Sequence, residues 1–357
     1  MPNGAGAEKR NRPEHQEGRD FMGRTLYLLS SGELKRKDNT IVVEGDAGRR
    51  FVPVETTDEI LVFGEVTLNK RFLEFATQTQ LILHFFNHHG YYQGSYYPRE
   101  HLNAGAVIVA QVKAYLDDSA RLDLAGRFVR GALANMEKVL VYYGNRKEDP
   151  VQKQTLQNSL AAVQRFRENL NDAGDVGQVM AFEGNAREAY YGAFDAIVED
   201  DRFLFESRTR RPPGNRMNAL ISFCNTLCYV SVLSQIYRTH LDPRIAYLHE
   251  TNFRRFSLNL DLSEIFKPLL VDRVIFSLLN RRALQVKHFS ETGNGVFLTE
   301  GGREIVLKTW EERLQGTIDH PTLNRKVSYR TLLRMEAYKL EKHILGDQPY
   351  EAFASRW

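Results

Sequence analysis

The spacing of hydrophobic residues changes once along this chain of 357 residues, close to Pro98. Before Pro98, short runs of β-branched and aromatic residues are separated by turn residues, which is typical of strands. After Pro98, hydrophobic residues recur every three to four positions, which is typical of amphipathic helices. No internal repeat is present. We therefore expect an α+β fold, in which a small N-terminal β-rich domain precedes a larger all-α domain.

The same patterns predict individual elements. We expect strands at 25–28, 40–43, 51–54, 60–63, 81–86 and 91–97, with one short helix within 68–76. We expect helices at 105–116, 121–143, 151–171, 176–199 and 330–345, and a short hairpin formed by 296–299 and 305–307. The predicted organisation is a disordered or cloning-derived tail (1–21), a β-rich domain (22–98), a linker (99–106) and a helical domain (107–357).

Composition limits the cellular environment more than the function. Lys and Arg number 48 against 45 for Asp and Glu, and an excess of +3 is too small to indicate a nucleic-acid partner by itself. Two cysteines, Cys224 and Cys228, exclude a disulfide framework and favour a reducing cytoplasm. They are spaced like core residues of a helix. The apolar stretch 219–237 carries many polar groups, so we expect a buried helix there and no membrane span.

Several common catalytic motifs do not occur in the sequence. It contains no Walker A loop, no GxGxxG, no HExxH, no GxSxG and no pair of CxxC motifs. Most nucleotide-cofactor enzymes and zinc proteases are thereby excluded.

Three segments could carry chemistry. Glu183 lies near the start of a predicted helix, where the helix dipole alone would explain an acid. His249 follows an apolar patch, where a hydrogen-bonded structural histidine is the common alternative. Asp261 and Glu264 are three residues apart, so their carboxylates share one helix face and repel each other. A bound cation, a nearby Arg254, Arg255 or Lys267, or simple solvation would each relieve this repulsion.

Together these segments offer carboxylate oxygens and an imidazole nitrogen without any thiolate. Such a donor set suits Mg²⁺ or Mn²⁺ better than structural zinc. A metal of this kind activates an oxygen nucleophile and neutralises charge on a phosphodiester. Glu183 and His249 are 66 residues apart, and His249 and Glu264 are 15 apart. These spacings do not establish that the three converge.

Basic residues cluster beside these segments and are candidate phosphate contacts. Solvated surface explains any single cluster equally well. The candidate DNA-binding residues are Arg208, Arg210, Arg211, Arg216, Arg254 and Arg255.

From Met22 onward the sequence resembles the catalytic subunit of the CRISPR adaptation integrase, the Cas-one family, and is similar to the subgroup found with type I-B and some type III systems. The resemblance rests on segments that occur in family order and are specific only in combination. They are RTLYLLSSGELKRKDNTIVVE, VPVE, EILVFGEVTLN, LILHFFNHHGYYQGSYYPRE, FEGNAREAYY, RRPPGNRMNALISF, HLDPRIAYLHE and FSLNLDLSEIFKPLLVDRVI. Departures include His240 and Ala246, where glycines are common, and Lys267, which replaces an arginine.

The resemblance implies a site and a reaction. It places the metal ligands and catalytic residues at Glu183, His249 and Glu264, with Asp261 as a supporting acid. It implies that the 3′-hydroxyl of a short DNA duplex attacks a phosphodiester at the edge of a CRISPR repeat. With water as the attacking group, the same site would act as an endonuclease. His249 would be a neutral ligand, so activity should fall when it is protonated.

The resemblance also implies partners. The β-rich domain would form a homodimer, and dimers would clamp a small ferredoxin-like subunit in a heterohexamer. Two alternatives remain at this point: a stand-alone metal-dependent nuclease of branched DNA, and a DNA-binding scaffold without catalysis.

Overall fold

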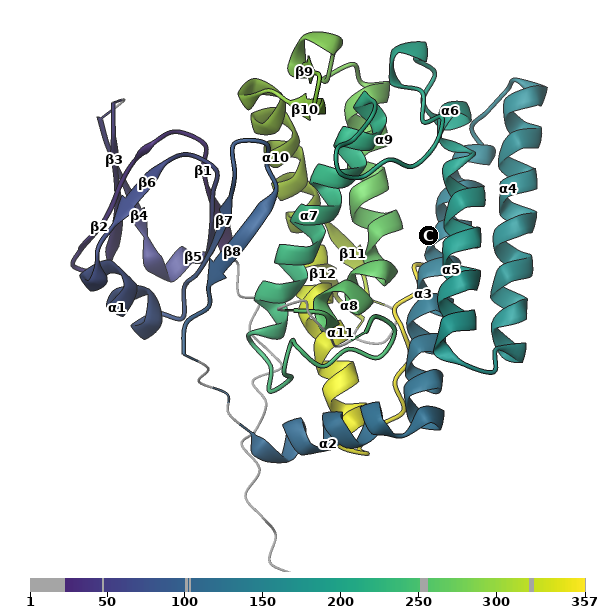
Figure 1. Cartoon of the computed structure of the whole chain (residues 1–357), viewed down its shortest axis with the longest axis horizontal. Coiled ribbons are helices and arrows are strands. Elements are labelled where there is room, and N and C mark those ends of the chain that lie inside the picture. Colours follow the sequence, from purple (N-terminus) through teal and green to yellow (C-terminus); the bar gives the residue numbers. More distant parts are fainter. Residues whose placement is uncertain are drawn as a thin grey trace, which may run out of the picture.

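The computed structural model describes residues 23–46, 48–99, 102, 104–250, 256–320 and 324–356. The expected tail at 1–21 and the candidate DNA contacts Arg254 and Arg255 lie outside the described residues. Within them, a β-rich unit lies beside a larger, mostly helical unit (Figure 1). The predicted α+β fold class is confirmed.

Two four-stranded sheets make up the β-rich unit in the described residues. Its elements are β1 (Arg24–Leu28), β2 (Gly32–Lys37), β3 (Thr40–Gly45), β4 (Gly48–Pro53), the 3₁₀ turn η1 (Val54–Thr56), β5 (Thr57–Val62), β6 (Val66–Leu68), α1 (Lys70–Gln78), β7 (Ile82–Phe86) and β8 (Tyr92–Tyr96). One sheet has the order β1-β5-β7-β8 and is parallel except for β8, and the other has the order β4-β3-β2-β6.

The sheet that contains β5 is covered on both faces. Ile60 and Val62 point into the core that the β-rich unit shares with α1, whereas Leu61 belongs to the core of the helical unit. This alternation follows from the two-residue period of a strand. It explains why β5 is buried along nearly its whole length. The two units therefore share a packed interface.

The second unit is mostly helical, with two short hairpins. Its helices are α2 (Gly105–Leu116), α3 (Asp118–Gly144), α4 (Pro150–Asn169), α5 (Val176–Tyr191), α6 (Phe194–Ile197), α7 (Arg216–Ile236), α8 (Leu258–Lys267), α9 (Arg273–Asn280), α10 (Glu300–Gln315) and α11 (Tyr329–Ile344). A π-helical turn, η4 (Pro268–Asp272), joins α8 to α9. The hairpins are β9 (Phe289–Thr292) with β10 (Gly295–Leu298), and β11 (Thr317–Asp319) with β12 (Lys326–Ser328), and short 3₁₀ turns are η2 (Leu170–Asp172), η3 (Asp201–Phe203) and η5 (Val286–His288).

The helices start where the sequence supplies caps. Asp117, Asp149 and Asp175 each accept a hydrogen bond from a backbone N–H in the first turn of α3, α4 and α5. At the other end of the chain, α11 ends just before Gly346, which has a φ of 78°. The predicted helices at 105–116, 121–143, 151–171 and 330–345 are confirmed to within a few residues.

Two predictions about this unit are wrong. Residues 305–307, expected to form the second strand of a hairpin, lie inside α10, and the hairpin is instead β9 with β10. Thr299 caps α10 by accepting from the Gly302 N–H, so the helix begins directly after β10. The helix expected over 176–199 is interrupted after Tyr191, and the short α6 follows it.

The long helix α7 runs through the middle of the helical unit (Figure 1). Among the described residues it alone is long and apolar enough to cross a membrane, and 83% of its most apolar window is buried inside the protein. Cys224 and Cys228 lie in it as free, fully buried thiols, and the prediction that they are core residues is confirmed. Burial raises the pKa of Cys228 to about 12, so this thiol is unreactive.

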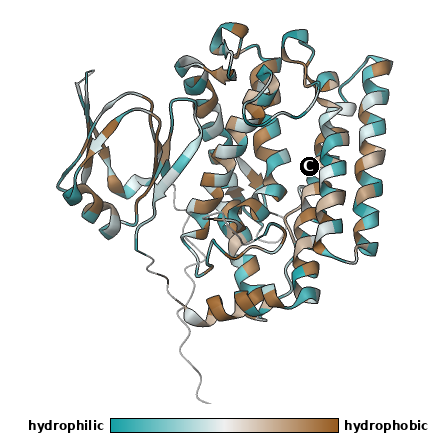
Figure 2. Cartoon of the chain, in the orientation of Figure 1, coloured by the Kyte–Doolittle hydropathy of each residue, from teal (hydrophilic) through white to brown (hydrophobic). Residues whose placement is uncertain are grey.

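By contrast, α2 is coloured hydrophobic along much of its length (Figure 2), and several of its hydrophobic side chains are exposed. Val109 is 54% exposed and Leu116 is 72% exposed. Apolar side chains grouped in this way on a surface are typical of a contact site.

A buried acid–base network joins the two units. Glu59 of β5 is 1% exposed, and its Oε1 accepts from Arg330 of α11 at 3.1 Å and from the Thr25 hydroxyl at 2.8 Å. Its Oε2 accepts a short hydrogen bond from the Ser234 hydroxyl of α7 and lies 3.5 Å from His84 Nε2. One carboxylate of a strand thus holds two helices of the other unit.

The same arginine extends the network. Arg330 Nη2 donates to both oxygens of Glu311 at 2.9 and 2.8 Å, and the Tyr27 hydroxyl donates to Glu311 at 2.9 Å. Buried charges need such partners because they have lost their hydration. The network therefore fixes how the β-rich unit sits on the helical unit.

Replacing Glu59 with alanine should strongly destabilise the protein, because Arg330 would lose its buried counter-ion. We expect a loss of about 3 to 5 kcal/mol in the free energy of unfolding, measured by urea denaturation. The matched control is Glu74→Ala, which removes the exposed Lys70–Glu74 pair and should leave the midpoint nearly unchanged. Equal midpoints for the two variants would contradict the role of the network.

The Glu59 carboxylate should also make the stability of the protein depend on pH. Burial alone would raise the pKa of Glu59, but the hydrogen bond from His84 and the charge of Arg330 outweigh it and lower the pKa from 4.5 to about 2. Because the pKa is lower in the folded state, this stabilisation is present above pH 4.5 and is lost as the pH falls toward 2. The difference in melting temperature between wild type and Glu59→Gln should shrink over that range. A constant difference would refute this assignment.

Candidate active site

The first carboxylate of the site lies in the middle of a helix. The Asp175 side chain caps α5 by accepting from the Gln178 N–H at 2.8 Å, and Glu183 is the eighth residue of that helix. The alternative that Glu183 is a first-turn acid favoured by the helix dipole is therefore wrong. Arg187 follows one turn later on the same face, and its Nε donates to Glu183 Oε1 at 2.5 Å.

A second carboxylate reaches the same arginine from another helix. Arg187 Nη2 donates to Glu264 Oε2 of α8 at 2.6 Å, and Lys267 Nζ donates to Glu264 Oε1 at 2.5 Å. Arg187 thus bridges Glu183 and Glu264, which are far apart in the sequence. Sequence reasoning did not single out Arg187, although its position four residues after Glu183 is the signal that could have found it.

These contacts keep a buried carboxylate ionised. Glu264 is 5% exposed, and burial alone would raise its pKa. The charges of Lys267 and Arg187 outweigh burial and lower the pKa of Glu264 to about 2. Burial opposes the charged form of Lys267 as well, but Glu264 raises the pKa of this lysine above its usual range, and Lys267 also lies over the Tyr229 ring at 4.9 Å.

The histidine of the site is held by the other acid of α8. Asp261 is fully buried, and it accepts hydrogen bonds from the backbone N–H groups of Tyr247, Leu248 and His249 at 2.7 to 3.0 Å. It also lies 2.8 Å from His249 Nδ1. A proton on Nδ1 satisfies this contact and leaves Nε2 as a lone-pair donor, which is how a carboxylate commonly orients a metal-ligating histidine.

The surroundings of His249 shift its pKa in opposite directions. Burial lowers its pKa, but the hydrogen bond and charge of Asp261, together with the charge of Glu264, raise it above its usual value.

The repulsion expected between Asp261 and Glu264 is relieved by partners. Solvation, one of the explanations considered, is wrong because both carboxylates are buried. Asp261 faces backbone N–H groups and His249, while Glu264 faces Arg187 and Lys267. The structure thus gathers Glu183 and Glu264 around one arginine and ties His249 to the same helix. Among the described residues, no three His, Cys, Asp or Glu side chains are grouped closely enough to hold a metal ion in this structure.

The candidate phosphate contacts fall into two groups. Arg208 donates to Asn218 and Ser222 of α7, and Arg216 pairs with Glu291 of β9, so both serve the fold. Arg210 and Arg211 are exposed. The second pair is therefore the better placed to meet a phosphate backbone.

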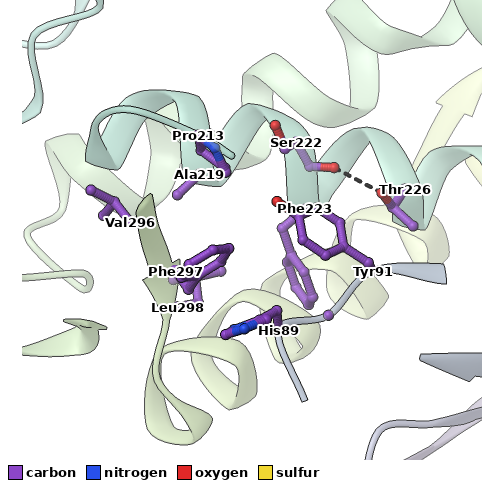
Figure 3. A pocket seen from close by; sticks show the side chains of 11 residues that line it. His89, Tyr91, Pro213, Ala219, Ser222, Phe223, Thr226, Val296, Phe297 and Leu298 are labelled. Carbon is purple, nitrogen blue, oxygen red and sulfur yellow. Dashed lines mark hydrogen bonds between the residues drawn. The ribbon is translucent and has the colours of Figure 1, made fainter. Parts of the chain in front are cut away.

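A hollow beside these arginines is too small for a nucleobase. It lies where the loop after β7 meets α7 and β10, and His89, Tyr91, Phe223 and Phe297 line it (Figure 3). Its volume of about 20 Å³ holds little more than one water molecule. The His89 and Phe297 rings stack at 4.1 Å, so the hollow is a packed junction between the units.

The chain is similar to known proteins over nearly its whole length. Residues 26–312 match the family model described as CRISPR associated protein Cas1. The CRISPR-associated endonuclease Cas1 2 of Thermodesulfovibrio yellowstonii is 51% identical over 94% of this chain and 100% of its own length. The CRISPR-associated endonuclease Cas1 of Thermotoga maritima is 48% identical over 91% of this chain and 98% of its own length.

Solved structures extend the comparison to the fold. A Cas1 protein from Thermotoga maritima superposes with a TM-score of 0.82 at 46% identity, covering 92% of this chain and 99% of that chain. A casposase bound to integration product gives a TM-score of 0.82 at 18% identity, covering 93% and 94%. At this identity the second likeness shows the fold alone.

Asp261 should be important for stability as well as for the site. Asp261→Ala leaves three backbone N–H groups and His249 Nδ1 without their acceptor, so we expect a loss of about 3 kcal/mol or more in urea denaturation. Asp261→Asn, which keeps one carbonyl oxygen, should lose less. Asp123→Ala, at an exposed ion pair of α3, is the control and should change little. Wild-type stability in Asp261→Ala would refute this view of the loop.

Proposed function

Because the chain belongs to the Cas1 family of CRISPR-associated proteins, we propose that it is a metal-dependent DNA integrase and endonuclease of CRISPR adaptation. The observation that carries the proposal is the convergence of Glu183 and Glu264 on Arg187, beside His249 held by Asp261. Relatives about half identical over their full length are named endonucleases, which supports the nuclease activity.

The residues of the site fit a hard divalent cation. Glu183, Glu264 and His249 Nε2 offer oxygen and nitrogen donors without thiolate, and the two carboxylates already face one positive charge, the Arg187 guanidinium. We propose that these three residues hold Mg²⁺ or Mn²⁺. Such a cation, when bound, supplies charge neutralisation at a phosphodiester and favours the ionised form of the attacking hydroxyl.

The protein's own groups have separate tasks in this scheme. Asp261 fixes the ring of His249 and keeps Nε2 available. Lys267 and Arg187 keep Glu264 ionised despite its burial. The 3′-hydroxyl of a short DNA duplex would attack a phosphodiester of the repeat, so that a P–O bond to the attacking oxygen forms while the P–O bond to the cut strand breaks. The attacking hydroxyl would lose a proton, and the displaced oxygen of the cut strand would take one up and leave as a hydroxyl. Arg210 and Arg211, with Arg254 and Arg255, would bind the DNA backbone.

The proposal includes partners and a location. Structural neighbours of low identity come from a Cas6-RT-Cas1–Cas2 complex and from a casposase bound to integration product, which supports DNA and a small ferredoxin-like subunit as partners. The outer strand β4 carries Phe51, 53% exposed, and the apolar side of α2 is uncovered. These surfaces support a homodimer through the β-rich unit and a heterohexamer with the small subunit. We place the protein in the cytoplasm, with α7 as a core helix.

Strand joining on a branched DNA tests the proposal. Labelled DNA that mimics a half-integrated spacer is incubated with the full chain and Mn²⁺ or with EDTA. We expect joined product only with the metal. Glu183→Ala and His249→Ala should each lower the rate at least about hundredfold while still binding DNA, because a stabiliser of transition-state charge is lost. Glu188→Ala, at an exposed carboxylate on the same helix, is the matched control and should retain the wild-type rate.

The other outcomes separate the alternatives. Cutting without joining by the wild type would favour a stand-alone nuclease of branched DNA. Absence of both reactions, even with the small partner subunit added, would favour a DNA-binding scaffold and overturn the enzyme assignment.

A further inference from the structure

A third carboxyl group lies beneath the site and takes no part in the contacts described so far. Asp272 is the last residue of η4 and is 1% exposed. Two contacts lie on either side of it, one from α5 and one from α6 to the α8–η4–α9 segment. At one end Arg187 meets Glu264 at 2.6 Å, and at the other Phe194 meets Phe276 with ring centroids 4.7 Å apart. Asp272 lies between these contacts, one helical turn before Phe276.

Two buried polar atoms in this region have no hydrogen-bond partner among the described residues. They are Arg187 Nη1 and Asp272 Oδ2. The charge of Arg187 and the hydroxyl of Tyr190 both act on the Asp272 carboxyl, so the three groups share one space. Burial raises the pKa of Asp272 to about 7. Such unsatisfied groups cost stability, which calls for an explanation at this place.

A bound metal would compete with Arg187 for its carboxylate partners. Arg187 donates to Glu183 and to Glu264, the same carboxylates that the proposed metal needs. A cation and a guanidinium repel each other and would compete for these oxygens. Arg187 is itself buried, so a guanidinium that gave up its carboxylates would need another anion nearby.

We propose that Asp272 is the alternative counter-ion of Arg187, which turns from Glu183 and Glu264 to Asp272 when the metal binds. The inference rests on the proposed metal site. Asp272 is then a positioning residue, which acts through Arg187 and never touches the metal or the DNA. The unpaired Nη1 already provides a donor for the second state, and the unpaired Oδ2 provides its acceptor.

Metal affinity, measured without DNA or turnover, tests this role. The full chain is titrated with Mn²⁺, and the free ion is followed by electron paramagnetic resonance. Asp272→Asn keeps the size of the side chain but removes its charge, and it should weaken Mn²⁺ binding about tenfold or more, as is typical for outer partners of a metal site. Asp272→Glu, which restores the charge, should stay within about threefold of wild type. Glu188→Gln, which removes an exposed carboxylate charge on α5, is the matched control and should bind like wild type.

The outcomes keep the two proposals apart. If wild type binds no Mn²⁺, or if Glu264→Gln binds it equally well, the metal site itself is refuted. If wild type binds at this site and Asp272→Asn binds equally well, only the counter-ion role is overturned. It is also overturned if Asp272→Glu loses as much affinity as Asp272→Asn, because charge would then not be the cause. Weak binding by Asp272→Asn with rescue by Asp272→Glu supports it.

Discussion

The bridge that Arg187 makes between Glu183 and Glu264 is the contact on which the site depends. Two carboxylates brought together in a buried place would repel each other and take up protons. With Arg187 between them and Lys267 beside Glu264, the repulsion is offset and the pKa of Glu264 remains about 2. The site is thus assembled as a nearly neutral set of charges, and α5 is fastened to α8 by the groups that would carry out the chemistry.

The interface between the two units follows the same principle at another place. Glu59 and Arg330 are both buried and balance each other across the boundary. The helix α7 connects the two networks, because Ser234 donates to Glu59 while Tyr229 lies against Lys267. The same helix thus contributes side chains both to the interface with the β-rich unit and to the surroundings of the candidate catalytic residues.

Much of the fold could be predicted because it depends on local pattern and caps. Most strands before Pro98 and the starts of the helices with Asp caps followed from spacing alone. The strands β2 and β6 were missed, because β2 is mostly polar and charged and β6 has only three residues. Ile305, Val306 and Leu307 were misassigned because three consecutive apolar residues with two β-branched members are typical of a strand. Their helix is decided by the Thr299 cap and by packing of Val306 and Leu307 in the core. The candidate ligands came from a family resemblance, since no local rule joins residues 66 and 15 positions apart.

What no local rule could supply is the pairing of charges across helices. Arg187 donates to Glu264, which lies 77 residues further along the chain. Asp261 accepts from the backbone N–H groups of residues 247–249, because that loop folds over it. These contacts change how metal binding should be understood. A cation cannot simply enter a vacant anionic cage here, since Arg187 and Lys267 already neutralise the carboxylates. In the proposed site, metal binding would exchange one positive charge for another, and its free energy would depend on where the displaced charge goes. The residues that accept this charge would therefore influence metal affinity, although they lie one layer further from the metal.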